Sequence, residues 1–406
     1  MKILVLNAGS SSQKSCLYEI TNDTLPMKAP QPIWQGEVNW TEDRDSGAIK
    51  VKTATGETLE EIISGYSRQA NVIYMLDALT HGATKVIDYL SEIDVVGHRV
   101  VHGGQDYQKP VIITQEVKEA IALLSNLAPS HNPLALAGIE TIEQTLGDVT
   151  QVAVFDTGFH RTIPDSAAIY PVPYEWVKKG IRRYGFHGIS HQYCSTRAAQ
   201  ILGRDLSSLR LITCHLGNGC SLAAIKHGRS VDTTMGFTPL EGLMMGSRSG
   251  SIDPGILIYL LRQSDYTPEQ LDHILNQASG LRGVSGVSSD LREIIKAIDQ
   301  GNQRAQLAWD MYVHRLQTGI GAMLGNLGGL DALVFTAGVG EKSAAIRQAA
   351  CESWEFLGLK IDPEKNHQSA IDVDIATEDS TIRVLVIGTQ EDWAIAQQCW
   401  QILNSL

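Results

Sequence analysis

Four short glycine-rich segments each include or follow an apolar run, and each could present backbone N–H groups to phosphate oxygens. They are ILVLNAGSSSQKS (3–15), LITCHLGNGCS (211–221), FTPLEGLMMGSRSGS (237–251) and LVFTAGVGEKS (333–343). One such segment alone says little, since it also fits an ordinary hairpin or βα turn. Four in one chain, with single arginines among them, indicate phosphoryl transfer between a nucleotide and a second small molecule.

The first segment combines several donors directly after a strand-like run. Asn7 follows ILVL, glycine lets the backbone approach a ligand, and the serines and Lys14 offer donors to phosphate oxygens. The Walker pattern G-x-x-x-x-G-K-[ST] is absent, so this is not a P-loop. A polar hairpin turn without a ligand is the alternative interpretation.

Two further segments have the pattern of phosphate-binding backbone. HLGNG at 215–219 follows a strand-like run, although Asn-Gly is also a strong signal for a type I′ hairpin. AGVGEKS at 337–343 predicts a strand, a glycine turn and then the N-terminus of a helix, which is a common anion site. For both segments a plain turn remains the competing prediction.

Two arginines stand in segments with almost no other charge. Arg99 lies in GHRVVHGG, and Arg248 in MMGSRSGS is the only cation between residues 230 and 261. A guanidinium fork pairs with carboxylate or phosphate, so an isolated arginine on a glycine-rich loop indicates an anionic ligand. An internal salt bridge of Arg248 with Glu241 or Asp253 is the alternative.

Two more candidates lie near the middle of the chain. Asp156 ends the apolar run VAVF, where ligand-facing residues of an α/β sheet emerge, although a helix N-cap would look the same. His187 in YGFHGISH can donate to a phosphoryl group, although a lone histidine is more often simply packed. His191 follows at i+4, but no carboxylate motif accompanies the pair, so zinc is not predicted.

Two acidic segments complete the candidates. Asp290 and Glu293 in SSDLREI fit a capping box that begins a helix, which is compatible with a ligand role for Arg292. Glu391 in IGTQEDWAIA follows a strand-like run and could bind Mg²⁺ directly or through water.

Length and composition limit the number of domains, the kinds of partner and the location that we expect. At 406 residues the chain exceeds one usual hydrophobic core, so we expect two domains. The net charge of −12 argues against binding to nucleic acid or to an anionic membrane. The six cysteines show no C-x-x-C spacing, which predicts free, mostly buried thiols, and no signal peptide or membrane span is apparent. A cytoplasmic location is therefore expected.

Strand-like and helix-like runs alternate along the chain. The expected strands are Ile3–Leu6 with a hairpin partner at Gln13–Ile20, then Val95–Val96, Val152–Phe155, Leu211–Cys214, Ser221–Ile225 and Val384–Ile387. The expected helices are Asn71–Leu90, Gln115–Leu124, Pro268–Gln277, Leu291–Asp299, Gln303–Leu327 and Asp392–Leu403. The order strand, glycine turn, strand occurs near the start of both halves, which predicts two related halves facing a cleft, with coincidence of common βαβ patterns as the alternative.

Eight motifs in order resemble the acetate kinase family of the sugar kinase, heat-shock ATPase and actin superfamily. They are NAGSSSQKS, GHRVVHGG, FDTGFH, YGFHGISH, HLGNG, GSRSGSIDPG, SSDLR and AGVGEK, and they span essentially the whole chain. The resemblance implies an α/β fold of two domains with duplicated ribonuclease H-like topology and a nucleotide cleft between them. The domains would be 1–156 plus 393–406, and 157–392 with most of the nucleotide site.

The resemblance also implies roles for individual residues. Asn7 and Glu391 would bind Mg²⁺, with Mn²⁺ as a substitute, and Lys14 would touch the nucleotide phosphates. Arg99 would hold the substrate carboxylate, while His187, Arg248 and Asp156 would serve catalysis. The residues implied to line the nucleotide ATP or ADP are His215, Leu216, Gly217, Asn218, Gly219, Asp290, Leu291, Arg292, Gly338, Val339, Gly340, Glu341 and Lys342. The residues implied to line the acyl pocket are Arg99, Val101, Ser130, Phe186 and Pro239.

Three positions depart from the family pattern. The family usually has leucine where Ser130 stands, asparagine where Lys342 stands and isoleucine where Val339 stands. Ser130 leaves the acyl-chain preference open, and Lys342 adds a charge beside the nucleotide.

The expected reaction is reversible, direct in-line transfer between ATP and acetate, giving acetyl phosphate and ADP, in a homodimer. Acetate is already ionised at neutral pH, so no general base is needed and Asp156 would orient Arg99 or a metal-bound water. A propionate or butyrate kinase is the alternative enzyme, and a sugar kinase or a nucleotide-gated binding protein is less favoured.

Overall fold

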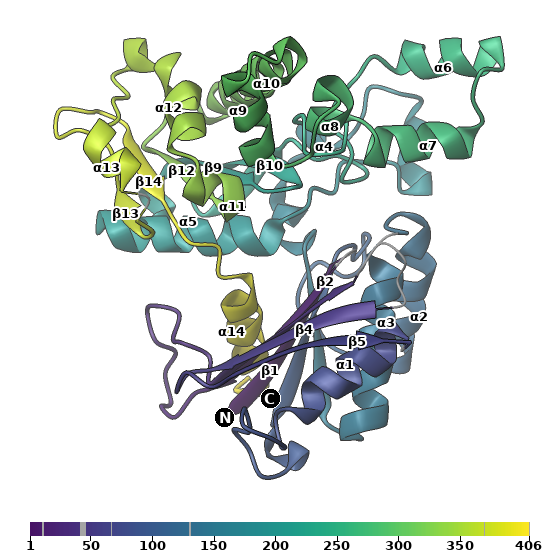
Figure 1. The fold of residues 1–406 in the computed structure, drawn as a ribbon. Helices are drawn as coiled ribbons and strands as arrows, with labels where there is room; N and C mark the ends of the chain where they lie inside the picture. Colours follow the sequence, from purple (N-terminus) through teal and green to yellow (C-terminus); the bar gives the residue numbers. More distant parts are fainter. Residues whose placement is uncertain (10–11, 41–45, 66, 130, 369, 406) are drawn as a thin grey trace. The chain divides into compact units, whose positions relative to one another are not determined.

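The computed structural model describes residues 1–406 except 10–11, 41–45, 66, 130, 369 and 406. The chain divides into two compact units. The first comprises Met1–Gly158 and Gln390–Leu406, and the second comprises Phe159–Thr389. Each unit is a twisted sheet with helices packed against it (Figure 1).

The first unit contains, among its described residues, an eight-stranded sheet in the order β5-β4-β3-β2-β1-β6-β8-β7. Its strands are β1 (Lys2–Ala8), β2 (Ser12–Glu19), β3 (Trp34–Trp40), β4 (Ser46–Thr53), β5 (Thr58–Ser64), β6 (Val95–Val100), β7 (Val111–Ile112) and β8 (Thr150–Phe155). Its α-helices are α1 (Arg68–Asp77), α2 (Gln115–Leu123), α3 (Asn132–Leu146) and α14 (Glu391–Leu403).

Successive residues of a strand point to opposite faces, and this places the polar candidates of the first sheet on one side. A Cβ on Gly97 of β6 would lie 2.6 Å from Cys399 Sγ of α14, so Gly97 faces α14. A Cβ on Gly138 of α3 would lie 4.0 Å from His98 Nδ1, so the next residue of β6 faces α3. Figure 1 shows α1, α2 and α3 on one side of this sheet and α14 on the other. Arg99, two residues after Gly97, therefore shares the α14 face.

The second unit contains a six-stranded sheet of described residues in the order β11-β10-β9-β12-β14-β13. Its strands are β9 (Arg210–Leu216), β10 (Cys220–Lys226), β11 (Arg229–Thr233), β12 (Ala332–Thr336), β13 (Val373–Asp374) and β14 (Arg383–Val386). Its α-helices are α4 (Asp165–Ala168), α5 (Gly188–Leu202), α6 (Pro254–Gln263), α7 (Pro268–Gln277), α8 (Gly280–Ser285), α9 (Leu291–Asp299), α10 (Gln303–Leu327), α11 (Ala337–Lys342), α12 (Ala344–Glu352) and α13 (Pro363–His367).

The two sheets share one topology. In the first, β3, β2 and β1 are antiparallel neighbours, β1, β6 and β8 are parallel, and β7 closes the edge antiparallel to β8. The second repeats this pattern strand for strand with β11, β10, β9, β12, β14 and β13. The predicted relation between the halves is therefore confirmed as a duplication of topology, and β4 and β5 are additions to the first unit.

The chain passes from the first unit to the second after Gly158 and returns at Gln390. Helix α14 follows β14 in the sequence but packs against β1 and β6 of the first sheet. Its buried face includes Trp393, Ile395 and Cys399. The last strand of one unit thus leads directly into a helix that covers the other sheet.

Several predicted elements differ from the structure. The helix expected over Asn71–Leu90 is α1 alone, which ends at Asp77, because Gly82 adopts a left-handed φ of 74° and the N–H groups of Val86 and Ile87 bond back to Leu79 O. The other predicted helices and strands are present, with ends that differ by a few residues at most except at Val95–Val96, which extends to Val100 as β6. The six cysteines are free and buried. Among the described residues, none of the helices is both long and apolar enough to cross a membrane.

Candidate active site

Three predicted site residues meet at the carboxyl-terminal ends of β1, β6 and β8. Arg99 donates from Nε to Asp156 Oδ1 (3.1 Å) and from Nη2 to Asp156 Oδ2 (2.6 Å), and its Nη1 donates to Asn7 Oδ1 (3.2 Å). Asp156 is fully buried, and the Arg99 side chain is 14% exposed. A guanidinium has five N–H groups, and three of those of Arg99 have partners in the described part of the chain, which leaves two to bind an anion. The ion pair expected between Asp156 and Arg99 is present.

Helix α14 adds two carboxylates to this group through its first turn. Asn7 Nδ2 donates to Glu391 Oε2 (3.4 Å) and to Asp392 Oδ1 (3.1 Å), while Cys16 Sγ lies 3.5 Å from Asp392 Oδ2. Burial raises the pKa of Asp392 and the Glu391 carboxylate adds to this, while the hydrogen bond from Asn7 opposes it. Asp392 was not predicted from the sequence, although its place beside Glu391 at a helix start was the available signal.

The charges around Arg99 are predominantly negative. Burial disfavours the charged guanidinium, but the carboxylates of Asp156, Glu391 and Asp392 outweigh this and raise the pKa of Arg99. Lys14 stands opposite Asn7 in the β1–β2 pair, and its side chain is exposed. One firmly charged arginine is thus surrounded by three carboxyl groups, a setting that favours a further bound cation.

One carboxylate oxygen of Glu391 is available to bind a metal ion. Its Oε1 is buried and has no hydrogen-bond partner among the described residues. No group of three or more His, Cys, Asp or Glu side chains within the described chain is arranged to hold a metal ion. Magnesium usually keeps several waters and takes only one or two protein carboxylates together with substrate phosphates. The residues present therefore fit Mg²⁺ and do not form a complete protein cage.

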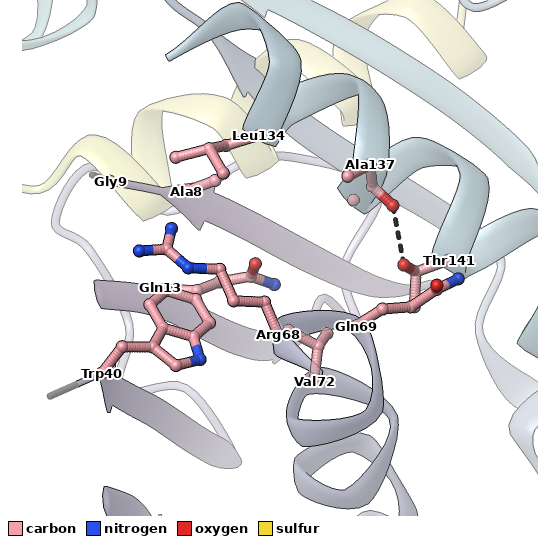
Figure 2. A pocket seen from close by; sticks show the side chains of 11 residues that line it. Ala8, Gly9, Gln13, Trp40, Arg68, Gln69, Val72, Leu134, Ala137 and Thr141 are labelled. Atoms are coloured by element: carbon pink, nitrogen blue, oxygen red, sulfur yellow. Dashed lines mark hydrogen bonds between the residues drawn. The ribbon is translucent and has the colours of Figure 1, made fainter. Parts of the chain in front are cut away.

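A small pocket opens in the first unit beside Gly9 (Figure 2). Its volume is about 30 Å³, room for about two water molecules. Arg68 stacks over the Trp40 ring at 4.4 Å, and Gln13 Nε2 and Trp40 Nε1 are buried with no hydrogen-bond partner within the described residues. The pocket suits water or a small polar group, and it is too small for a nucleotide.

In the second unit, His187 and Arg248 converge on Gly219. A Cβ at Gly219 would lie 3.4 Å from His187 Nε2 and 3.5 Å from Arg248 Nη1. His187 is the N-cap residue of α5 and has a left-handed φ of 56°, and its ring stacks on His215 with centroids 4.1 Å apart. The imidazole and the guanidinium therefore both lie within van der Waals distance of the place that a Cβ on Gly219 would take.

The loop that carries Arg248 is held by contacts within the second unit. Arg248 Nη1 donates to Pro239 O at 3.1 Å. The two carboxylates considered as salt-bridge partners of Arg248 have other roles. Glu241 pairs with Arg183 (2.8 Å), and Asp253 caps α6 by accepting from Gly255 N (2.8 Å).

Two of the predicted nucleotide segments lie at the carboxyl-terminal ends of β9 and β12 in the second sheet. Gly217 to Gly219 form the turn between β9 and β10. His215, near the end of β9, pairs with Thr336 at the end of the parallel strand β12. This turn is a hairpin, as the alternative interpretation had it, but none of its residues has the positive φ of a type I′ turn. Gly246 has no room for a side chain, because a Cβ would lie 2.3 Å from Asn218 Oδ1 and 3.0 Å from Ser289 O. The turn, the Arg248 loop and the start of α9 are therefore in contact.

The prediction of a glycine turn over residues 337–343 is wrong. Gly338 to Lys342 lie in α11, a short helix that begins directly after β12, and Ala337 supplies the change of direction with a φ of 64°. Gly338 and Lys342 are exposed, Gly340 is buried and Val339 is half-buried. Glu341 Oε1 accepts from Thr389 N at 2.8 Å, which ties this segment to the end of the second unit.

Arg347 holds the same segment through hydrogen bonds to its backbone carbonyl groups. The sequence analysis did not predict this residue. Its fully buried guanidinium donates from Nη1 to Gly340 O and to Glu341 O, both at 2.8 Å, and from Nε to Asn366 Oδ1 at 2.8 Å. Burial lowers the pKa of Arg347. Its position on α12, shortly after the glycine-rich segment, was the only signal in the sequence.

Asp290 begins α9 and pairs with Arg292. Its side chain accepts from Arg292 N at 2.9 Å and from Arg292 Nη2 at 2.5 Å. Glu293 pairs with Lys296 at 2.8 Å, so the predicted N-cap is present but its carboxylate partner points elsewhere. Leu291 is buried, and the Arg292 side chain is largely exposed.

The predicted acyl-pocket residues are distributed over both units. Val101 is buried in the first unit, where it follows β6. Phe186 is buried in the second unit, and its carbonyl accepts from His160 Nε2 at 3.0 Å, while Pro239 is half-buried beside Arg248. Ser130 lies outside the described residues.

The duplicated ribonuclease H-like sheets, with glycine-rich turns and arginines at their strand ends, define a kinase of the sugar kinase, heat-shock ATPase and actin fold. The chain belongs to the acetokinase family, whose sequence profile matches residues 2–397.

Several relatives are similar to this chain over its full length. The acetate kinases of Trichormus variabilis and of a Nostoc species are each 76% identical to this chain over 404 residues and cover 100% of both sequences. Among solved structures, the acetate kinase of Porphyromonas gingivalis is 41% identical with a TM-score of 0.89 and 99% coverage of both chains. A propionate kinase from Francisella tularensis is 37% identical with a TM-score of 0.88 and 98% coverage of both chains.

Proposed function

We propose that this protein is an acetate kinase that transfers the γ-phosphoryl group of ATP to acetate, reversibly and by direct in-line attack. The observation that carries the proposal is the convergence of His187 Nε2 and Arg248 Nη1 on the same position beside Gly219. Such a transfer has a loose transition state in which charge spreads over the phosphoryl oxygens. Donors fixed around that position stabilise the charge as it develops.

Arg99 would bind the carboxylate of acetate through its two remaining N–H groups. Asp156 holds the guanidinium by two parallel hydrogen bonds and thereby fixes the direction in which those groups point. Acetate is ionised at neutral pH, so Asp156 has no proton to remove from it. Asp156 would instead orient Arg99, so that the acetate carboxylate is held in line with the γ-phosphoryl group of ATP.

Asn7 and Glu391 would hold Mg²⁺, with Mn²⁺ as a substitute. The buried, unpartnered Glu391 Oε1 and the excess of carboxylates around Arg99 support this assignment. When bound, the ion would neutralise charge on the nucleotide phosphates, which Lys14 would also contact. A test independent of turnover is Mn²⁺ binding followed by electron paramagnetic resonance, where Glu391→Gln should weaken binding by about tenfold or more.

The nucleotide would occupy the edge of the second sheet. The segments that would line it are His215 to Gly219, Asp290 to Arg292 and Gly338 to Lys342. The position of the first and third at the ends of the parallel strands β9 and β12 supports this. Lys342 is exposed there and adds a positive charge that the family pattern lacks.

A propionate kinase is the second candidate, because a relative of that name has the same fold over nearly its full length. The acyl pocket would be formed by Arg99, Val101, Ser130, Phe186 and Pro239, and the family's usual leucine is absent at Ser130. A smaller polar wall would alter the fit of the acyl chain by an amount equivalent to about one methylene.

We further propose that the protein acts in the cytoplasm as a homodimer, and that α6 contributes to the interface. The sequence of α6 is PGILIYLLRQ, yet none of its residues is buried in the single chain, and Ile256, Ile258 and Tyr259 are each about half exposed. An apolar helix of this kind marks an interaction site. Sedimentation velocity of Ile258→Asp should show monomer, while Phe356→Asp, which changes an exposed apolar residue elsewhere, should stay dimeric; a dimeric Ile258→Asp would contradict this interface.

Trapping of acyl phosphate as a hydroxamate tests the function directly. The protein with acetate, ATP and Mg²⁺ should give acetyl hydroxamate, and EDTA should abolish the product until Mg²⁺ is restored in excess. The same assay with propionate and butyrate separates the two candidates. ATP hydrolysis without acyl phosphate from any of these acids would refute the proposal.

A further inference from the structure

A chain of buried hydrogen bonds lies behind His187. His187 Nδ1 is 2.9 Å from Ser221 Oγ on β10, and Ser221 Oγ is 2.8 Å from His191 Nε2 on α5. His191 Nδ1 is in turn 2.6 Å from Thr213 Oγ1 on β9. Thr213, His191 and Ser221 are all fully buried. We call these three residues the relay.

His191 in the relay is neutral. Burial lowers its pKa well below the ordinary value, and the neighbouring rings of His160 and His215 act in the same direction. A neutral imidazole has one N–H donor and one acceptor nitrogen. Ser221 Oγ could accept from both rings at once, but its own hydroxyl proton would then have no acceptor among the described residues. The arrangements that pair the Ser221 proton therefore run in one direction or in the other.

In one direction, His191 Nδ1–H donates to Thr213, Ser221 donates to His191 Nε2, and His187 Nδ1–H donates to Ser221. The Thr213 hydroxyl proton then has no acceptor, because among the described residues His191 is the only side-chain hydrogen-bond partner of Thr213 Oγ1. A buried hydroxyl proton without an acceptor costs about 1–3 kcal/mol.

In the other direction every proton has an acceptor. Thr213 donates to His191 Nδ1, His191 Nε2–H donates to Ser221, and Ser221 donates to His187 Nδ1. The remaining proton of a neutral His187 is then on Nε2, the nitrogen that faces Gly219 and Arg248. Buried hydroxyl groups favour this direction because it satisfies both of them.

We propose that the relay of Thr213, His191 and Ser221 keeps Nδ1 of His187 as an acceptor, so that His187 acts as a neutral Nε2–H donor to the phosphoryl group. This inference rests on the proposed function for the role of His187, and it makes the relay residues positioning residues. Arg248 then supplies the positive charge, and His187 supplies a directed hydrogen bond.

The surroundings of His187 support a neutral ring. Its imidazole stacks on His215 at 4.1 Å, and Arg248 Nη1 lies across the space beside Gly219. A second positive charge there would be repelled by the guanidinium. The left-handed backbone of His187, with φ of 56°, costs about 1–2 kcal/mol, which is consistent with a ring that must point in one direction.

Nitrogen NMR on protein labelled with ¹⁵N-histidine tests the proton position. It is read on the resting protein near neutral pH, so it can fail even if the enzyme is an acetate kinase. His187→Gln assigns the signals of His187. Nε2 of His187 should be protonated and Nδ1 unprotonated, and Thr213→Val should raise the fraction with a proton on Nδ1. An imidazolium, or an Nδ1–H tautomer in the unaltered protein, would overturn the proposal.

Kinetic measurements test whether Thr213 affects catalysis through His187. Two hydrogen-bonded residues, His191 and Ser221, separate Thr213 from His187. Thr213→Val keeps the shape of the side chain and removes its hydroxyl, and we expect kcat to fall about tenfold with KM for acetate and ATP within about threefold. Thr213→Ser, which restores a hydroxyl, should recover most of kcat. A folded Thr213→Val with unchanged kcat would contradict the relay.

A double-mutant cycle separates positioning from general stability and also serves if Thr213→Val does not fold. Ser221→Ala should lower kcat about tenfold in the unaltered protein and change it less than twofold in a His187→Ala background. Equal losses in both backgrounds would mean that Ser221 does not act through His187.

Discussion

Replacement of Asp156 by asparagine isolates the orientation of Arg99. The substitution keeps the size and one acceptor oxygen, but it removes the charge and places an NH₂ group against the guanidinium. Asp156 is fully buried, so water cannot take the place of the lost oxygen. Arg99 would keep its contact with Asn7 at 3.2 Å and lose one of the two bonds that define its plane.

The size of the effect follows from those two bonds. A hydrogen bond between charged groups contributes about 1.5–3 kcal/mol, and deletion of one member of a buried ion pair costs about 3–5 kcal/mol. Because asparagine retains one acceptor, we expect the free energy of unfolding to fall by about 2–3 kcal/mol. If the same loss appears in the transition state, kcat/KM for acetate falls about 100-fold.

The assay is the initial rate of acetyl hydroxamate formation over a series of acetate concentrations, together with urea unfolding of each variant. Asp331→Asn is the matched control, since Asp331 also accepts from an arginine, Arg210 Nε at 3.1 Å, but lies outside the proposed site. It should alter stability slightly and leave kcat/KM within about twofold.

A folded Asp156→Asn with kcat/KM near that of the unaltered protein would refute the reasoning. It would mean that Arg99 does not need the carboxylate to hold its direction, or that Arg99 does not bind the substrate. Loss of stability without loss of turnover would reduce the ion pair to a structural contact.

The remaining predictions address other parts of the molecule. Arg248→Ala should lower kcat by about 10³-fold or more, with Arg229→Ala near the unaltered rate, and near-normal turnover of the first would remove Arg248 from catalysis. Ser130→Leu should shift the relative kcat/KM for acetate, propionate and butyrate by about tenfold, and constant ratios would place Ser130 outside the pocket. Burial lowers the pKa of His98 to about 4, so the unfolded chain binds this proton more readily and stability should fall from about pH 6.5 down to pH 4. His98→Gln should flatten that part of the pH profile of urea unfolding, and an unchanged slope would contradict the assignment. Gln13→Leu should raise the free energy of unfolding by about 1 kcal/mol because it removes a buried amide nitrogen, Nε2, that has no hydrogen-bond partner among the described residues, and a loss of stability would show that the amide makes stabilising hydrogen bonds.

Features set by local sequence were predictable. An apolar run before a polar turn identified β1, β8 and β9, and the ends of such strands supplied Asn7 and Asp156. Once β1, β6 and β8 are parallel neighbours in the first sheet, their carboxyl ends meet, and a carboxylate beside Arg99 is a natural consequence.

Features set by distant pairing were not predictable from one chain. Ser221 and Thr213 are ordinary strand residues until β9, β10 and α5 pack together around His191. The error at Gly338 has a different cause. Glycine permits many backbone conformations, so a glycine-rich pattern alone could not distinguish the turn that was predicted from the short helix that forms.

The path of the chain also determines when the first unit can be completed during synthesis. The surface of β6 around Gly97 receives Ile395 and Cys399 of α14, which are synthesised only after the whole second unit. Until then, most of this unit is present with an apolar surface exposed, and Asn7 lacks Glu391 and Asp392. Nascent chains stopped before α14 should therefore associate with chaperones, and an isolated amino-terminal half should aggregate unless a peptide of residues 390–406 is supplied.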